Sequence, residues 1–239
     1  MKSAEEARST VRKPIEVPSA EDVINQVNSR GKLSPYLRVG FSRYAEDAEK
    51  IKLAEAALAK TDLDIKAELL SAFIRDKSFP LSHEAIIEYS RSAHEHLREV
   101  AFGILENCQS EIVRDYALTL LADEKHKTGV LRMLICNYAP EIKALLLDEL
   151  YQIKINDRTE ADRHSIGFKI LNVCDQNVPL PKEFFIYIYE TTRCSCCRES
   201  AIRALAKRGW LTREIIEECR HDSNCEISQY INRDYPPRS

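Results

Sequence analysis

The stretch EHLREVAFGILENCQSEIVRDYALTLL, residues 95–121, decides the fold class. Its first half places apolar residues three and four positions apart, which draws one hydrophobic stripe along a helix. This stripe comprises Leu97, Val100, Ala101, Ile104, Leu105 and Cys108. The second half repeats the spacing with Val113, Tyr116, Ala117, Leu120 and Leu121. Polar residues such as Arg114 and Asp115 fall on the opposite side and can stay hydrated. The sequence therefore predicts two successive amphipathic helices.

Stripes of the same kind run along much of the chain. They comprise Ile65, Leu69, Ala72 and Phe73, then Val130, Leu131, Leu134 and Ile135, then Ile142, Leu145, Leu146 and Leu150. Each predicted helix has only about 11 to 15 residues, and isolated helices of that length are marginal in water. Each needs neighbours to cover it, at roughly 1.5 to 3 kcal/mol for each fully buried Leu or Ile. We expect the helices to stack in chain order.

Capping residues and prolines indicate where the helices begin and end. Ser19 precedes Glu21 and Asp22, and Ser34 precedes Pro35, and both patterns are typical of helix starts. Further boundaries are expected at Thr61-Asp62, Ser82, Asn156-Asp157, Thr212, Ser223-Asn224, Pro80, Pro140 and Pro181. Links this short make neighbouring helices antiparallel.

One segment, FFIYIY at residues 184–189, also suits a buried strand because it is rich in aromatic and β-branched residues. We predict a helix there, because Pro181 can start one and no partner strand is evident elsewhere in the sequence.

The composition agrees with a helical fold. The 239 residues include only 6 Gly and 9 Pro against 44% hydrophobic and 31% charged residues, which leaves few turn-formers for an all-β fold. We therefore predict an all-α protein of about a dozen helices. Residues 1–18 mix charge, Ser and Pro without periodicity, which predicts a flexible N-terminal tail. We expect residues 19–239 to form a single domain.

The charge of the chain narrows the range of partners. The formal net charge of -3 and a pI near 6.1 give no overall attraction for phosphate backbones or anionic membranes. The first residues lack the apolar stretch of a signal peptide, and no later segment approaches the ~20 apolar residues that span a bilayer. We expect a cytoplasmic protein with no membrane contact.

A short sequence pattern recurs at irregular intervals where helices are expected to start. It has an acidic or polar residue, an aliphatic residue and often a basic residue, as in Asp64-Ile65-Lys66, His96-Leu97-Arg98 and Glu141-Ile142-Lys143. The aliphatic positions lie 32 residues apart (97 minus 65) and then 45 apart (142 minus 97). Over roughly residues 44 to 235 the chain resembles the HEAT-like repeats also found in phycobilin-lyase-related proteins. The resemblance implies an α-solenoid, a curved superhelix of stacked antiparallel helix pairs.

The last fifth of the chain is rich in cysteine. Cys194, Cys196 and Cys197 lie close together, with a C-x-x-C spacing between Cys194 and Cys197, and Cys219, His221 and Cys225 follow. If residues 197–208 and 212–222 form an antiparallel hairpin, these groups converge and could hold zinc, which binds four Cys or His ligands. The alternatives are that Cys197 and Cys219 are small buried thiols on the apolar stripes, or that the same groups form a reversible disulfide. We predict buried thiols, with no metal and no cofactor.

Four basic residues near these cysteines are the predicted binding residues: Arg198, Arg203, Lys207 and Arg208. Glutamates interleave with them, so a mixed, solvated face is the competing interpretation. No phosphate loop, dinucleotide motif, H-E-x-x-H pair or nucleophile elbow occurs, and we predict no catalytic residues.

The sequence thus predicts a non-catalytic scaffold for protein–protein interaction. The repeat resemblance by itself also implies an accessory, lyase-like action on a bound chromophore or protein. The main alternative is a nucleic-acid binder related to the HEAT-like DNA glycosylases, a family that embraces a duplex with a basic concave face and places tryptophans against the lesion. This chain has a single tryptophan, Trp210, at a predicted turn, and its acidic net charge also disfavours that alternative.

Overall fold

The computed structural model describes residues 17–123, 125–155, 160–175 and 178–236. Of the predicted tail, residues 1–16 lie outside the described part. Within the described residues the protein is all-helical, without a strand. The described chain forms fourteen α-helices and two short 3₁₀ helices: α1 (Ala20–Arg30), α2 (Pro35–Tyr44), α3 (Asp47–Ala59), α4 (Leu63–Leu70), η1 (Ser71–Phe73), α5 (His83–Tyr89), α6 (Glu95–Leu105), α7 (Glu111–Thr119), α8 (Lys127–Cys136), η2 (Pro140–Ile142), α9 (Lys143–Ile155), α10 (Glu160–Asp175), α11 (Lys182–Thr191), α12 (Ser195–Lys207), α13 (Arg213–Arg220) and α14 (Cys225–Asp234).

Several predicted helix starts are confirmed by side-chain caps. Ser19 and Asp22 form a reciprocal capping box at α1, in which the Ser19 N–H donates to the Asp22 carboxylate at 2.8 Å. The Asp62 carboxylate accepts two backbone N–H groups at the start of α4. The hydroxyls of Ser82 and Thr212 cap α5 and α13 in the same way. The predicted boundary at Asn156-Asp157 lies outside the described residues.

The ambiguous segment 184–189 is a helix, as predicted. It belongs to α11, where Phe184, Phe185, Tyr187 and Ile188 are all fully buried. Helices α9, α10 and α12 all contact α11 and cover most of its circumference. A helix buried on several sides carries apolar residues at nearly every position, which explains why its sequence also resembles that of a buried strand.

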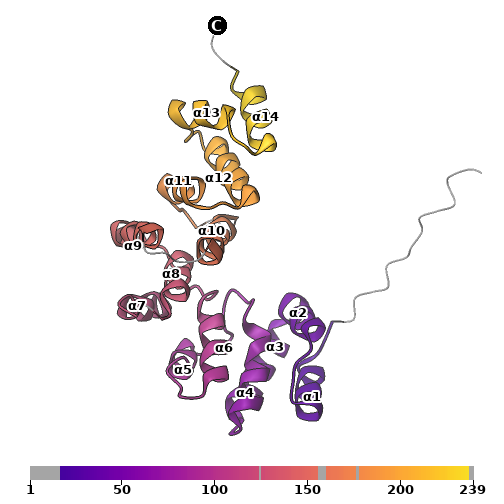
Figure 1. Ribbon diagram of the computed structural model, residues 1–239. Helices are drawn as coiled ribbons and strands as arrows, with labels where there is room; N and C mark the ends of the chain where they lie inside the picture. Colours follow the sequence, from indigo (N-terminus) through magenta and orange to yellow (C-terminus); the bar gives the residue numbers. More distant parts are fainter. Residues whose placement is uncertain (1–16, 124, 156–159, 176–177, 237–239) are drawn as a thin grey trace, which may run out of the picture.

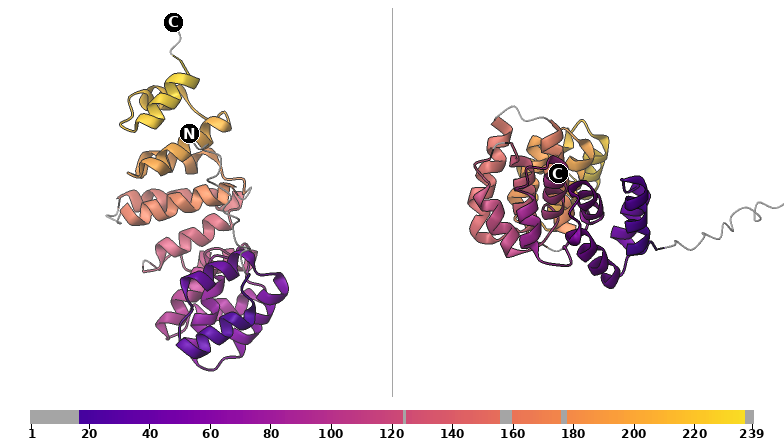
Figure 2. Two further views of the ribbon diagram at one scale, coloured as in Figure 1. Left: turned by 90° about the vertical axis from the view of Figure 1, so that its right-hand side faces the viewer. Right: turned by 90° about the horizontal axis from the view of Figure 1, so that it is seen from below.

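The helices lie in two rows. From α4 to α14, each even-numbered helix contacts the next even-numbered helix, while in the other row α5 contacts α7 and α9 contacts α11. Pairs of consecutive helices, such as α5 with α6 and α11 with α12, join the rows. Figure 1 shows a bent array with α6, α8, α10 and α12 on the inside of the bend. In the left view of Figure 2 the layers from α7 to α14 lie one above another.

The predicted stripes form the contacts between these layers, with one correction. Leu105 is fully buried in α6, as expected. Leu145, predicted to be part of the buried stripe of α9, is instead 42% exposed. Ile142, Leu146 and Leu150 are buried, and their four-residue spacing follows one line along the helix. Leu145 lies beside that line, so the prediction for Leu145 was wrong.

The helices on the inside of the bend, α6, α8, α10 and α12, are called the inner row. Two asparagines make the same kind of hydrogen bond at the ends of helices of this row. The Asn107 side chain donates to the carbonyl of Ile74 at 2.7 Å, and the Asn137 side chain donates to the carbonyl of Cys108 at 2.9 Å. Each bond joins the end of one layer to the end of the layer before it. The two asparagines are 30 residues apart (137 minus 107). The same hydrogen bond therefore recurs at about the spacing of one helix pair.

Among the helices that the structure describes, none combines the length and the apolar character that crossing a lipid bilayer would require.

Candidate functional site

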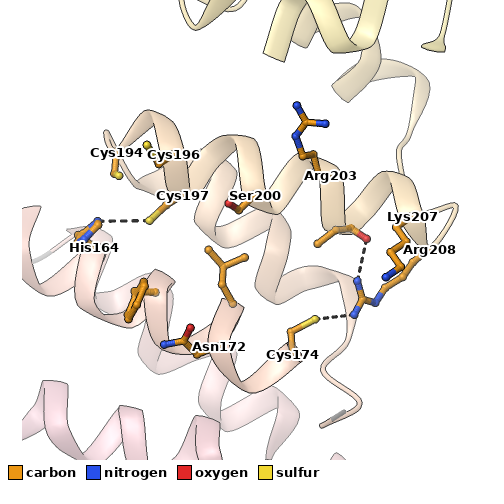
Figure 3. A pocket seen from close by; sticks show the side chains of 13 residues that line it. His164, Asn172, Cys174, Cys194, Cys196, Cys197, Ser200, Arg203, Lys207 and Arg208 are labelled. Carbon is orange, nitrogen blue, oxygen red and sulfur yellow. Dashed lines mark hydrogen bonds between the residues drawn. The ribbon is translucent and has the colours of Figure 1, made fainter. Parts of the chain in front are cut away.

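A pocket of about 730 Å³ lies between α10 and α12 on the inner row. Figure 3 shows the side chains that line it, which come from these two helices and the residues at their ends. The apolar part includes Leu171, Ala204 and Phe168, and the ring of Phe168 is 55% exposed. An exposed aromatic ring beside a pocket is a typical anchor point for a ligand or partner.

Basic side chains occupy the end of the pocket formed by the second half of α12. Arg203, Lys207 and Arg208 all line it, and none of its described lining residues is an Asp or Glu. The Arg208 guanidinium donates to the Cys174 sulfur at 2.6 Å and lies 5.6 Å from the centre of the Trp210 ring, which holds it in place. The pocket therefore has positive charge along an apolar wall.

The Arg203 side chain makes two contacts within the chain but remains accessible to solvent. It pairs with Glu199 one turn earlier at 2.8 Å and lies over the Tyr230 ring at 4.7 Å. Its side chain remains 47% exposed, so it can turn towards an incoming anionic group. Such exposed pairs contribute about 0.5 kcal/mol or less, and exchanging Glu199 for a ligand carboxylate costs little.

The fourth predicted binding residue lies elsewhere. The guanidinium of Arg198 pairs with the Asp222 carboxylate and lies 5.1 Å from the Tyr189 ring centre, outside the pocket lining. The Asp222 side chain is only 1% exposed. Arg198 therefore satisfies a buried carboxylate and joins the start of α12 to the end of α13.

The cysteines are arranged differently from the predicted zinc cluster. Cys194 and Cys197 do lie together at the start of α12, but their third neighbour is His164 on α10. The His164 Nδ1 and the Cys197 Sγ are 3.5 Å apart. Among the described residues, these three form the one group of three or more possible metal ligands within bonding range of one another.

The predicted hairpin is partly present, yet it does not gather the later cysteines. The side chain of Asn224 donates to the Ser195 carbonyl at 3.3 Å, so the start of α12 does lie near the end of α13. Cys219, however, is fully buried, and Cys225 is exposed at the start of α14. Neither these two nor His221 belongs to the group of three.

The two clustered thiols have opposite environments. Backbone N–H groups at the helix start, chiefly that of Cys197, lower the pKa of Cys194. Burial raises the pKa of Cys197. The half-exposed Cys194 sulfur therefore loses its proton more easily than an ordinary thiol, whereas the Cys197 sulfur is buried and holds its proton more tightly.

A second pocket, of about 410 Å³, lies further along the inner row. It is lined by Phe102, Glu106, His126 and Asp162, among others, and the His126 ring stacks on Phe102 at 4.7 Å. Glu106 pairs with Arg132 at 3.0 Å, and burial raises the pKa of Glu106. Acidic side chains are therefore part of this pocket, unlike the first.

Lys169 is buried between the layers, where its amino group donates to Asn107 at 3.0 Å. Burial lowers the pKa of Lys169. The bond joins α10 to the end of α6, so Lys169 helps to fix the spacing of the inner row.

No protein-family model, curated protein or solved structure matches this chain.

Proposed function

We propose that the protein is a non-catalytic HEAT-like scaffold that binds a protein partner in the pocket between α10 and α12. The two-row arrangement, the contacts between near neighbours and the repeated roles of Asn107 and Asn137 support a solenoid of the HEAT-like type. In such an array the inner row offers an extended surface whose shape is fixed by the packing of the repeats.

The observation that carries the proposal is the combination of Phe168 with Arg203, Lys207 and Arg208 around one pocket. A desolvated aromatic contact supplies affinity, and the surrounding charges select the partner. The best-matched occupant is a peptide segment with a bulky apolar side chain followed by acidic residues. Its apolar side chain would pack against Phe168 and Leu171, and its carboxylates would face the three cations.

A nucleic-acid partner fits the inner row less well. Binding a duplex calls for a continuous basic surface, but Glu106 and Asp162 line the second pocket on the same row. The single tryptophan is also engaged within the chain, because Trp210 packs against Phe185 with 6.1 Å between ring centres. These features favour a protein segment over a phosphate backbone.

The test is site-specific photo-crosslinking in cells of the source organism. A photoreactive phenylalanine analogue replaces Phe168 in one variant and Tyr36 in a matched control, because Tyr36 is 71% exposed on α2, far from the pocket in sequence. We expect a nuclease-resistant protein crosslink from position 168 that is absent from position 36.

Adding Lys207→Glu to the position-168 probe should abolish that crosslink without altering the helical circular dichroism. Crosslinks that disappear with nuclease would support the nucleic-acid alternative. Equal crosslinking from both positions, or insensitivity to the charge reversal, would refute the proposed pocket.

A further inference from the structure

His164, Cys194 and Cys197 form a second candidate site at one end of the same pocket. This site does not depend on which partner the pocket binds. The imidazole comes from α10 and the two sulfurs come from the first turn of α12. All three ligand atoms lie within 4.8 Å of one another. We propose that these residues hold a zinc ion that ties α10 to α12, with Cys196 as the fourth ligand.

The geometry suits tetrahedral zinc. With Zn–N and Zn–S bonds of about 2.0 and 2.3 Å, the N-to-S edge of a regular tetrahedron measures about 3.5 Å. The His164 Nδ1 and the Cys197 Sγ are 3.5 Å apart. The pair is therefore already at the separation that a shared ion would require. The Cys194 sulfur lies within 4.8 Å of both atoms and would approach them by at most about 1.3 Å.

Local structure explains why two of the sulfurs face the same way. Cys194 is the N-cap residue of α12 and Cys197 lies three positions later, so both side chains project from one side of the helix start. A C-x-x-C pair at a chain turn is a common way to supply two zinc ligands. His164 then approaches from the neighbouring helix of the inner row.

Cys196 is the residue best placed to complete the tetrahedron. It is exposed, lines the same pocket and lies beside Cys194 at the same end of α12 in Figure 3. Completing the tetrahedron requires the Cys196 side chain to change its rotamer, which an exposed thiol can do. Three thiolates and one imidazole form a closed structural site of a type typical of zinc.

The sulfur and nitrogen ligand atoms determine which class of metal ion the site would bind. Thiolate and imidazole ligands favour zinc and related soft or borderline ions over magnesium and calcium, which prefer oxygen. Two arginines flank the cysteines in sequence. Arg198 is neutralised by Asp222, and Arg193 is exposed, so water screens its charge. The ion would add a fixed link between α10 and α12 and thereby hold the two walls of the pocket together.

The experiment measures metal content of the full chain purified without chelator and in the presence of a thiol reductant. We expect one zinc ion per chain by elemental analysis. Replacement of zinc by cobalt should give sulfur-to-cobalt charge-transfer absorption together with the visible bands of a tetrahedral cobalt centre. Protein that neither carries zinc nor binds added zinc or cobalt would overturn the proposal.

Single substitutions test which residues bind the zinc ion. His164→Ala and Cys196→Ser change exposed or partly exposed positions, so both should fold, and each should weaken zinc binding by at least about tenfold because one metal bond is lost. The matched control is Cys225→Ser, which removes an exposed thiol outside both the group and the pocket and should bind zinc as the parent does. Zinc binding unchanged in His164→Ala would refute the site.

A redox pair is the competing outcome. If Cys194 and Cys197 instead join in a disulfide, two thiol hydrogens are removed by an oxidant and the intact mass falls accordingly. Finding that disulfide in place of zinc in protein kept under reductant would contradict the metal assignment.

Discussion

Replacing Arg198 with alanine should weaken the C-terminal part of the array far more than replacing Arg203. Removing one partner of a buried ion pair costs about 3 to 5 kcal/mol. Here the Asp222 side chain is 1% exposed but that of Arg198 is 23% exposed, and the Asn224 N–H still donates to Asp222 at 2.8 Å. Those two features reduce the loss, and we expect about 2 to 4 kcal/mol, including the lost contact with the Tyr189 ring.

The control, Arg203→Ala, removes a side chain that is 47% exposed and paired along one helix, so it should cost less than about 1 kcal/mol. Urea unfolding followed by circular dichroism gives the free energies, and amide hydrogen exchange shows whether α13 and α14 open first. Replacing both partners, as Arg198→Met with Asp222→Leu, should recover most of the loss.

The reasoning fails if Arg198→Ala and Arg203→Ala cost the same. It also fails if Arg198→Ala removes partner binding while leaving stability and exchange in α13 and α14 unchanged, because Arg198 would then be a binding residue as the sequence predicted.

Three further outcomes test the packing, the caps and the buried thiols. Leu105→Ala should cost about 2 to 5 kcal/mol in urea unfolding and Leu145→Ala less than about 1, because the first side chain is fully buried and the second is 42% exposed; similar losses would contradict the assigned faces. Asp22→Ala should lower thermal stability at neutral pH by about 0.5 kcal/mol. The hydrogen bond from the Ser19 N–H holds the pKa of Asp22 below its ordinary 3.8, so the carboxylate stabilises the fold above that value. The stability difference between the parent and Asp22→Ala should therefore vanish as the pH falls through the lowered pKa. A difference that grew in acid would refute this. Cys108 should resist alkylation in the folded chain while Cys225 reacts, since burial raises the pKa of Cys108 to about 12, and mass spectrometry showing early modification of Cys108 would contradict it.

Local sequence signals predicted the helices well because their causes are local. Ser19 and Asp62 cap the helices that they were expected to cap, since a capping side chain bonds to N–H groups only two or three residues away. The spacing around Leu105 placed its buried face correctly. Leu145 was misplaced because it lies in the aliphatic run Ala144-Leu145-Leu146-Leu147, and periodicity alone does not say which Leu of such a run faces the neighbouring layer.

The site was less predictable because it depends on contacts between helices distant in sequence. His164 lies 30 residues before Cys194 (194 minus 164), and no motif joins them. Helix packing alone brings His164 to Cys197. Arg198 illustrates the converse, because its basic character suggested binding, whereas its partner Asp222 is 24 residues away and becomes visible only in the folded chain.

The arrangement of the inner row has a mechanical consequence. Each even-numbered helix from α4 to α14 contacts the next even-numbered helix, so these interfaces follow one another along the array. A slight rotation at every interface would add up along the array, and its ends would shift much more than any single layer. The hydrogen bonds of Asn107, Asn137 and Lys169 join neighbouring layers, and a rotation at those interfaces would have to break or stretch them.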